Sequence, residues 1–197
     1  MQLRTLIWRG IFQPGAEYFS LARDTDGWQL RGNVAAVMGG QPTHVQYIVA
    51  CDAAWRTRTV DIQVETGRQD RSLHLRANGL GQWWERDAER PELAGCIDVD
   101  LVASASTNTL PIRRLGLAIG ESRDLHMAWV RFPELQVVRS EQTYTRLADC
   151  TYRYRNGTFE ADLEVDDLGL VVVYPGYCER IAWLDVPLST PLTESLR

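Results

Sequence analysis

The sequence predicts an all-β fold: a single antiparallel sheet, strongly curled or barrel-like, with little helix. Three observations predict it. Apolar and polar residues alternate in many short runs, tight-turn dipeptides separate these runs, and no helical periodicity persists beyond about three turns. Large all-β domains reach the length of this chain without dividing, so we expect one barrel-like domain over residues 1–197.

The clearest strand covers residues 159–166, where four apolar residues alternate with four acidic ones. Residues 56–66 alternate in the same way. The dipeptides Asn156-Gly157 and Asp26-Gly27 favour the positive φ of tight hairpins, and each separates two such runs. A short turn or helix is expected at residues 87–93. Further strands are expected at residues 2–8, 18–23, 28–34, 44–51, 72–76, 97–101, 115–119, 135–139, 152–155 and 168–174.

The composition argues against several classes of protein. A net charge of −5 and a pI near 5.3 disfavour nucleic-acid binding and electrostatic docking to anionic membranes. No stretch is long and apolar enough to span a bilayer, and the first residues do not resemble a signal peptide. The four cysteines are widely spaced, which favours free buried thiols. We therefore expect a cytoplasmic protein without stable membrane insertion.

Common signatures of catalysis are missing from the sequence. It contains no Gly-rich phosphate loop, no nucleophile elbow and no zinc-binding helix motif. The three histidines, His44, His74 and His126, are isolated from one another along the chain. We therefore expect no cofactor and no metal site, and we favour a binding protein over an enzyme.

The segment from Asn108 to Leu115 places two adjacent arginines, Arg113 and Arg114, before an apolar run. If residues 115–119 form a strand, Arg113 shares a face with its apolar side chains. Arg58 stands in the same relation to the apolar face of residues 60–64. Both arginines are expected to point into a cavity mouth and to bind an anionic or polar head group through forked hydrogen bonds. The alternatives are a solvated rim or a structural ion pair.

Carboxylates and aromatic residues complete the set of candidate side chains. Asp98 and Asp100 share one face of the strand at residues 97–101, where they either orient the arginines or act as the acid and base of a glycosidase-like site. Tryptophan and tyrosine combine an apolar body with a polar tip, which suits them to sugar rings and lipid grooves. The aromatic candidates are Trp55, Trp83, Trp129, Tyr144 and Tyr174.

An ordered set of motifs resembles the bacterial putative glycolipid-binding family, over about residues 8–183. The motifs are Cys51-Asp52-x-x-Trp55-x-Thr57-Arg58, Gly95-Cys96-Ile97-Asp98-Val99-Asp100-Leu101, Asn108-Thr109-Leu110-Pro111-Ile112-Arg113-Arg114-Leu115, Ala128-Trp129-Val130-x-Phe132-Pro133, Gln142-x-Tyr144 and Tyr174-Pro175-Gly176.

The resemblance implies a curled, barrel-like antiparallel sheet, distantly similar to the periplasmic lipoprotein localisation factors. The sequence departs from the expected pattern in two places. Those factors are exported, whereas this chain shows no export signal. Tyr177-Cys178 also replaces the bulkier apolar or aromatic pair expected after Gly176, which argues against a ligand contact at that end.

These observations predict non-enzymatic binding of an amphipathic small molecule, such as a glycolipid, in the cavity of the sheet. An enzyme acting on a carbohydrate or small carboxylate through Asp98 and Asp100 is the alternative. A plain interaction scaffold would lack a cavity of about 300 Å³ or more. The predicted ligand-binding residues are Arg58, Arg113, Arg114, Asp98, Asp100, Trp55, Trp83, Asn108, Trp129, Tyr144 and Tyr174.

Overall fold

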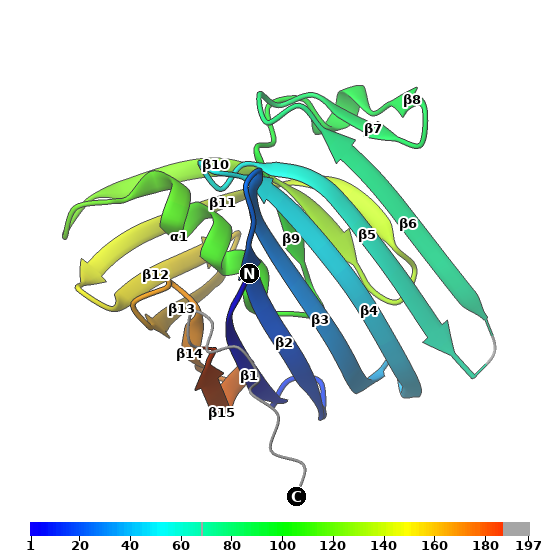
Figure 1. Cartoon of the computed structure of the whole chain (residues 1–197), viewed down its shortest axis with the longest axis horizontal. Coiled ribbons are helices and arrows are strands. Elements are labelled where there is room, and N and C mark those ends of the chain that lie inside the picture. Colours follow the sequence, from blue (N-terminus) through cyan, green and yellow to red (C-terminus); the bar gives the residue numbers. More distant parts are fainter. Residues whose placement is uncertain (68, 187–197) are drawn as a thin grey trace, which may run out of the picture.

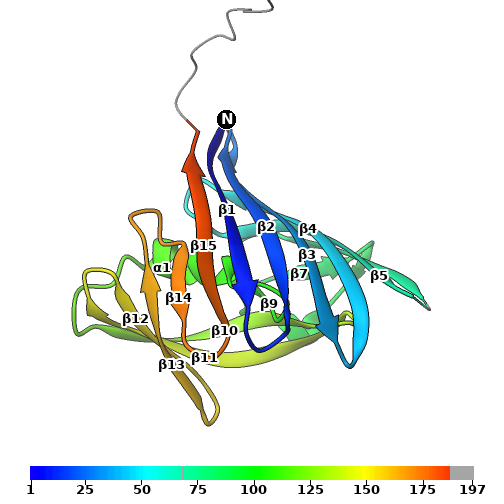
Figure 2. The same ribbon diagram turned by 90° about the horizontal axis from the view of Figure 1, so that it is seen from below.

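The computed structural model describes residues 1–67 and 69–186 and confirms the predicted all-β class. Its 15 strands form one continuous sheet in the order β8-β7-β6-β5-β4-β3-β2-β1-β15-β14-β13-β12-β11-β10-β9. Neighbouring strands are antiparallel except β9 and β10, which run parallel. The sheet is open, because its end strands β8 and β9 do not pair, and it is strongly curled (Figures 1 and 2).

The first half of the chain contributes the strands β1 (Gln2–Gly10), β2 (Gly15–Arg23), β3 (Gly27–Met38), β4 (Gln41–Asp52), β5 (Thr57–Thr66), β6 (Asp70–Ala77), β7 (Trp83–Glu85) and β8 (Ala88–Glu89), the short helix η1 (Pro91–Leu93) and the strand β9 (Asp98–Leu101). The second half contributes the helices η2 (Ser106–Asn108) and α1 (Thr109–Leu115) and the strands β10 (Ser122–Arg131), β11 (Gln136–Ala148), β12 (Thr151–Asn156), β13 (Phe159–Val165), β14 (Val171–Tyr174) and β15 (Cys178–Asp185).

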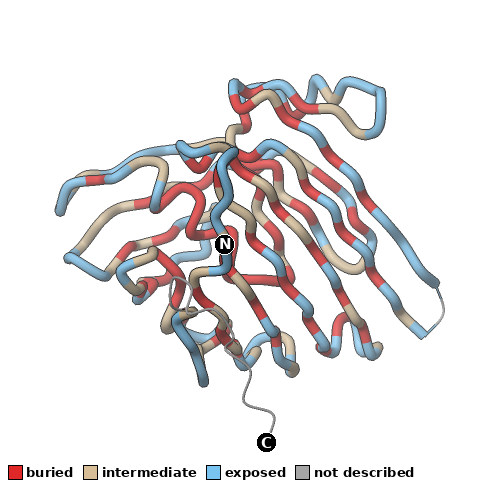
Figure 3. Tube along the Cα trace, viewed as in Figure 1, coloured by how far each residue is buried: buried red, intermediate tan, exposed pale blue. Residues whose placement is uncertain are grey.

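Buried and exposed residues alternate along the strands, as Figure 3 shows, because successive side chains point to opposite faces of a sheet. The buried face turns toward the inside of the curl. Gly32 permits one close approach there: it pairs with Tyr47 across β3 and β4, and a Cβ at Gly32 would lie 2.1 Å from the tyrosine ring. The ring therefore lies flat over the glycine and directs its hydroxyl inward.

The inside of the curl is filled by residues 98–115, which comprise β9, η2 and α1 and which we call the inner segment. It contacts both halves of the sheet. The Val99 amide donates to Thr57 Oγ1 of β5, at 3.2 Å, and Tyr144 of β11 donates to Asn108 Oδ1, at 2.8 Å. The concave face of the sheet carries apolar side chains. The inner segment covers these side chains and keeps them out of water.

The structure corrects the strand predicted at residues 115–119. The preceding residues form helix α1, and Gly116 ends it in a left-handed conformation with φ of 55°. Pro111 is compatible with this helix because it lies in the first turn, where the backbone amide has no partner within the helix. After Gly116 the chain has no regular structure up to residue 118 and forms a turn at residues 119–120, so the apolar run does not become a strand.

The helix reverses the predicted roles of the two arginines. Arg114 points inward and forms a bidentate ion pair with Asp98, whose side chain is fully buried; Arg114 Nη2 lies 2.6 Å from Asp98 Oδ2. Arg113 is exposed and donates to the Asp167 carbonyl oxygen at 3.3 Å. Arg58 is also exposed and donates to the Asn78 carbonyl oxygen at 2.6 Å. The prediction that Arg58 and Arg113 face inward is wrong, because neither lies on a buried face.

A buried polar cluster joins the inner segment to β2 and β4. Tyr47 donates to the carboxylate of Glu17, and Ser104 Oγ donates to the same oxygen at 2.8 Å. Ser106 Oγ lies 2.6 Å from the Tyr47 hydroxyl oxygen. Burial raises the pKa of Glu17 to about 7, although the hydrogen bonds from Tyr47 and Ser104 oppose the rise.

Replacing Arg114 by Ala is expected to destabilise the fold by about 3–5 kcal/mol, because Asp98 would remain buried without its partner. Arg113→Ala, which removes an exposed side chain, is the matched control and is expected to cost less than about 1 kcal/mol. Urea unfolding followed by tryptophan fluorescence measures both. Equal losses in the two variants would contradict the assignment of the structural ion pair to Arg114.

Glu17→Gln is expected to raise the melting temperature by roughly 3 °C or more at pH 8 and by less at pH 5. The pKa of Glu17 is about 7 in the folded state and 4.5 as its ordinary value. Between these two pH values the native state therefore holds a proton that the unfolded state has released. Stability from this group is therefore present at low pH and is lost as pH rises through about 7. If the melting temperatures of the wild type and the variant differed by the same amount at pH 5 and pH 8, the prediction would be wrong.

Candidate ligand-binding cavity

A cavity of about 400 Å³ lies between the inner segment, strands β10 and β12–β14, and the β1–β2 and β14–β15 turns. We call it the aromatic cavity, because six aromatic side chains line it: Phe12, Trp129, Tyr154, Phe159, Tyr174 and Tyr177. Its polar lining consists of Asp100, Ser104, Asn108 and Asn156. No arginine or other cationic side chain belongs to the lining formed by the described residues. Its volume exceeds about 300 Å³, the size of cavity that a plain interaction scaffold was expected to lack.

Asp100 of β9 is the charged group of the aromatic cavity. Gln142 Nε2 donates to its Oδ2 at 2.6 Å, and Thr107 Oγ1 lies 3.4 Å from its Oδ1. Burial raises the pKa of Asp100 to about 6, while the contacts with Gln142 and Thr107 lower it. The carboxylate thus has an orienting amide but no cation among the described residues. Such a group is a strong acceptor for hydroxyl donors of a ligand.

Two asparagines contribute amide groups to the lining, Asn108 from the inner segment and Asn156 from beside the β12–β13 turn. Asn108 is fixed from behind: Tyr144 donates to its Oδ1, and its Nδ2 donates to the Ala105 carbonyl oxygen at 3.2 Å. Asn156 donates to Ser140 Oγ at 3.2 Å. Amide groups held in this way offer hydrogen bonds of fixed direction, which suits recognition of a hydroxylated molecule.

Four of the aromatic side chains form a continuous series across the mouth of the cavity, with exposed rings at both ends. Ring centroids are 6.3 Å apart for Phe12 and Tyr177, 4.6 Å for Tyr177 and Tyr174, and 6.2 Å for Tyr174 and Phe159. Phe12 is 69 % exposed and Phe159 is 47 % exposed, whereas Tyr174 is buried. Asp100 and Asn108 of the inner segment thus lie on the inner side of the cavity, and the exposed Phe12 and Phe159 lie at its mouth.

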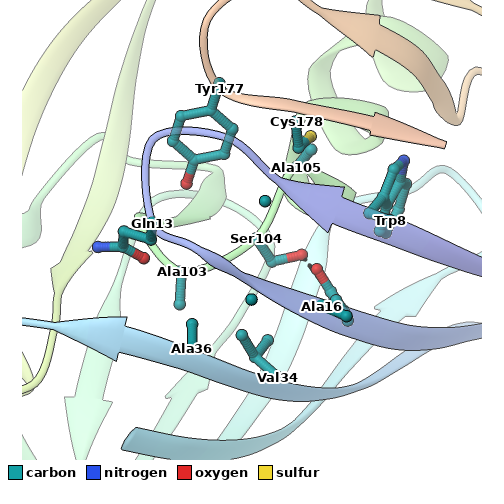
Figure 4. A pocket seen from close by; sticks show the side chains of 13 residues that line it. Trp8, Gln13, Ala16, Val34, Ala36, Ala103, Ser104, Ala105, Tyr177 and Cys178 are labelled. Atoms are coloured by element: carbon teal, nitrogen blue, oxygen red, sulfur yellow. Dashed lines mark hydrogen bonds between the residues drawn. The ribbon is translucent and has the colours of Figure 1, made fainter. Parts of the chain in front are cut away.

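A second, much smaller cavity of about 30 Å³ lies on the other side of Tyr177 (Figure 4). Ser104 and Tyr177 line both cavities, and the Tyr177 hydroxyl donates to the Val102 carbonyl oxygen. The small cavity has room for about one water molecule. Because it is so small, we assign ligand binding to the aromatic cavity.

The structure brings four of the predicted site residues together in the aromatic cavity: Asp100, Asn108, Trp129 and Tyr174. Tyr144 lies behind them and contacts two lining residues: it donates to Asn108, and its ring centroid lies 5.3 Å from that of Tyr154. The other predicted residues lie elsewhere. Asp98 and Arg114 pair with each other, and Arg58 and Arg113 bind backbone carbonyl oxygens on the surface.

Trp55 and Trp83, predicted to line the ligand cavity, have structural contacts instead. Trp55 stacks on Trp28 with ring centroids 4.1 Å apart, and the Arg113 guanidinium lies 5.7 Å from the Trp55 ring. Trp83 is fully buried and donates from Nε1 to the Cys96 carbonyl oxygen at 2.7 Å. Core packing therefore explains both tryptophans.

Four lining aromatics were not predicted: Phe12, Tyr154, Phe159 and Tyr177. Three of them lie in or beside hairpin turns, at the β1–β2, β12–β13 and β14–β15 connections. An apolar aromatic side chain in a tight turn is a signal that was available in the sequence. The sequence argued against a ligand contact at Tyr177, but Tyr177 lines the aromatic cavity.

The two carboxylates considered for catalysis do not share the aromatic cavity. Both oxygens of Asp98 accept hydrogen bonds from Arg114, and Asp98 is not part of the lining, whereas Asp100 is. A glycosidase-like mechanism requires two carboxyl groups on either side of one bond. This geometry favours a binding site over that mechanism.

Two general properties of the described residues complete the picture. Within residues 1–67 and 69–186, no helix combines the length and apolar composition needed to cross a membrane. Over the same ranges, no three His, Cys, Asp or Glu side chains gather in an arrangement suited to a metal ion.

Comparison with known proteins identifies the family. A crystal structure of a DUF1089 family protein from Pseudomonas aeruginosa is similar to this fold, with a TM-score of 0.78 and 37 % sequence identity, covering 84 % of this chain and 92 % of that one. No curated protein matches the sequence. Residues 5–180 match the family described as putative glycolipid-binding. The match spans most of the curled sheet and the whole inner segment, and the chain belongs to this putative glycolipid-binding family.

Proposed function

We propose that this protein binds the head group of a glycolipid, without catalysis, in the aromatic cavity. The observation that carries the proposal is the composition of the lining: aromatic rings combined with one half-buried carboxylate and two oriented amides. Aromatic faces pack against the C–H faces of sugar rings, and carboxylate and amide groups exchange hydrogen bonds with sugar hydroxyls. The family description is consistent with this ligand class.

The charge of the lining selects the kind of head group. Asp100 contributes a negative charge, and no cationic side chain of the described residues lines the cavity to receive a phosphate, sulfate or carboxylate. An anionic head would be repelled by Asp100 and left without a partner. The proposal is therefore an uncharged, hydroxyl-rich head, in place of the anionic head expected when Arg58 and Arg113 were assigned to the site.

The volume of the cavity separates the head from the tail. A cube of about 400 Å³ has an edge of about 7 Å. An acyl chain is about 15 Å long, half the thickness of a bilayer core. The cavity accommodates a sugar-sized group but not an extended chain. Since its inner side is polar and its mouth aromatic, the head enters and the tail leaves past Phe12 and Phe159.

Octyl glucoside and octyl phosphate have the same tail and different heads, so calorimetric titration of both tests the proposal. We expect octyl glucoside to bind and octyl phosphate to bind at least about tenfold more weakly. Asp100→Asn and Trp129→Ala should each weaken octyl glucoside binding by about tenfold, because each removes about 1–2 kcal/mol of contact.

Arg113→Ala is the control and should bind octyl glucoside like the wild type, since Arg113 lies outside the cavity. Tighter binding of octyl phosphate than of octyl glucoside would restore the anionic head group. Absence of binding for both compounds, with no lipid retained in native mass spectrometry of the purified protein, would disprove the proposed function.

The affinity for octyl glucoside should fall as pH is lowered through about 6, the value to which burial raises the pKa of Asp100. Protonation removes the charge that strengthens the hydrogen bonds from ligand hydroxyls. Titrations between pH 5 and pH 8 measure this dependence. Asp100→Asn should show a flat profile over the same range; a variant profile as steep as that of the wild type would assign the pH dependence to another group.

A further inference from the structure

Part of one end of the curled sheet carries no charge. Four segments meet there: residues 10–16, 34–43, 156–159 and 174–178, none of which contains Asp, Glu, Lys, Arg or His. They form the β1–β2, β3–β4, β12–β13 and β14–β15 turns with their flanks, and we call them the uncharged rim. In Figure 2 these four turns lie along the lower edge of the molecule, away from the N-terminus.

The uncharged rim is a contiguous surface around the mouth of the aromatic cavity. The ring series Phe12–Tyr177–Tyr174–Phe159 connects three of the turns. The Val37 amide donates to the Pro14 carbonyl oxygen at 2.9 Å and so joins the fourth turn to the first. Large apolar side chains stand out from this surface: besides Phe12 and Phe159, Ile11 is 49 % exposed and Val37 is 45 % exposed.

Several charged residues border the uncharged rim. Arg71, beside the β5–β6 connection, and Glu134, of the β10–β11 connection, line one hollow together with Met38, Gly39 and Gln41 of the rim. Arg9 forms an ion pair with Glu179, next to the β14–β15 turn, and Arg155 forms one with Glu160, next to the β12–β13 turn. The turns at the opposite end of the same strands carry charges of both signs instead. Arg23 and Arg56 lie in or beside these turns, and Arg4 forms ion pairs with Asp166 and Asp167. The aspartates of these turns are Asp24, Asp26, Asp52, Asp149, Asp166 and Asp167.

We propose that the uncharged rim docks on the surface of a lipid bilayer, so that the mouth of the aromatic cavity faces the membrane. Exposed apolar side chains gathered at one end of a soluble fold mark a contact surface, and aromatic residues favour the membrane–water interface. The opposite end is rich in charged groups, which are costly to remove from water, and it therefore points away from the bilayer. Docking of this kind depends on apolar contact and not on the electrostatic attraction that the net charge argues against.

A bilayer is preferred to a protein partner because of what the rim surrounds. A protein seated on the rim would close the cavity, whereas a membrane presents glycolipid heads to it. This choice of partner rests on the proposed function. It also agrees with the cavity volume, because the acyl tails remain in the bilayer while the head occupies the cavity.

Flotation of the full chain with phosphatidylcholine vesicles, with and without a few per cent of a neutral glycolipid, tests the docking. The double variant Ile11→Ser/Val37→Ser removes rim side chains that do not line the aromatic cavity. We expect it to bind vesicles at least about tenfold more weakly than the wild type. Leu80→Ser is the matched control, because Leu80 is 72 % exposed and lies in the β6–β7 connection at the opposite end.

Wild-type binding should persist at about 0.5 M salt, where electrostatic attraction is screened. Failure of the wild type to float with either vesicle, or an equal loss in Leu80→Ser, would overturn the proposal. A concentration-dependent dimer that Ile11→Ser/Val37→Ser abolishes, without vesicle binding, would assign the rim to a second copy of the chain.

Calorimetry with octyl glucoside separates this proposal from the proposed function. Ile11→Ser/Val37→Ser should bind octyl glucoside as the wild type does. Vesicle binding without octyl glucoside binding would leave the docking in place and remove the proposed function. Octyl glucoside binding without vesicle binding would remove only the docking.

Discussion

The ion pair between Asp98 and Arg114 holds the inner segment in place, and the aromatic cavity depends on it. β9 is the end strand of an open sheet and runs parallel to β10. Helix α1 returns the chain to the same place, where Arg114 meets the buried carboxylate of Asp98. Two residues further along β9, Asp100 faces the cavity, so the pair that closes the connection also sets the position of the cavity's carboxylate.

Alternation and turn chemistry predict most of the strands, because both are local properties of the chain. The hairpin at Asn156-Gly157 and the strands around it are present, and the alternation of residues 56–66 corresponds to β5. Helix α1 was not predictable in this way. It has only seven residues, too few for a helical period to be recognised, and it is stabilised by the burial of Leu110 and Ile112 and ended by the left-handed Gly116.

The sequence predicted those residues of the candidate site that belong to the inner segment or to a strand facing it. Asp100, Asn108, Trp129 and Tyr174 satisfy this condition. The aromatics of the cavity mouth do not, since Phe12 and Tyr177 lie far apart in sequence and meet only because β1 pairs with β15. Arginines were misassigned for a related reason: whether Arg113 or Arg114 points inward follows from helix geometry, which places adjacent residues on different sides.

The polarity of the cavity constrains how any amphipathic ligand can bind. A carrier that encloses acyl chains needs an apolar interior and a polar entrance. Here the order is reversed, with Asp100 and Asn108 on the inner side and Phe12 and Phe159 at the entrance. Burial of an acyl chain against Asp100 would desolvate the carboxylate without a partner, which is costly. A hydroxylated head satisfies the carboxylate, and the apolar entrance then contacts the tail and the surface from which it emerges. The same arrangement of charge and apolar surface therefore accounts both for the class of head group and for an uncharged rim around the mouth.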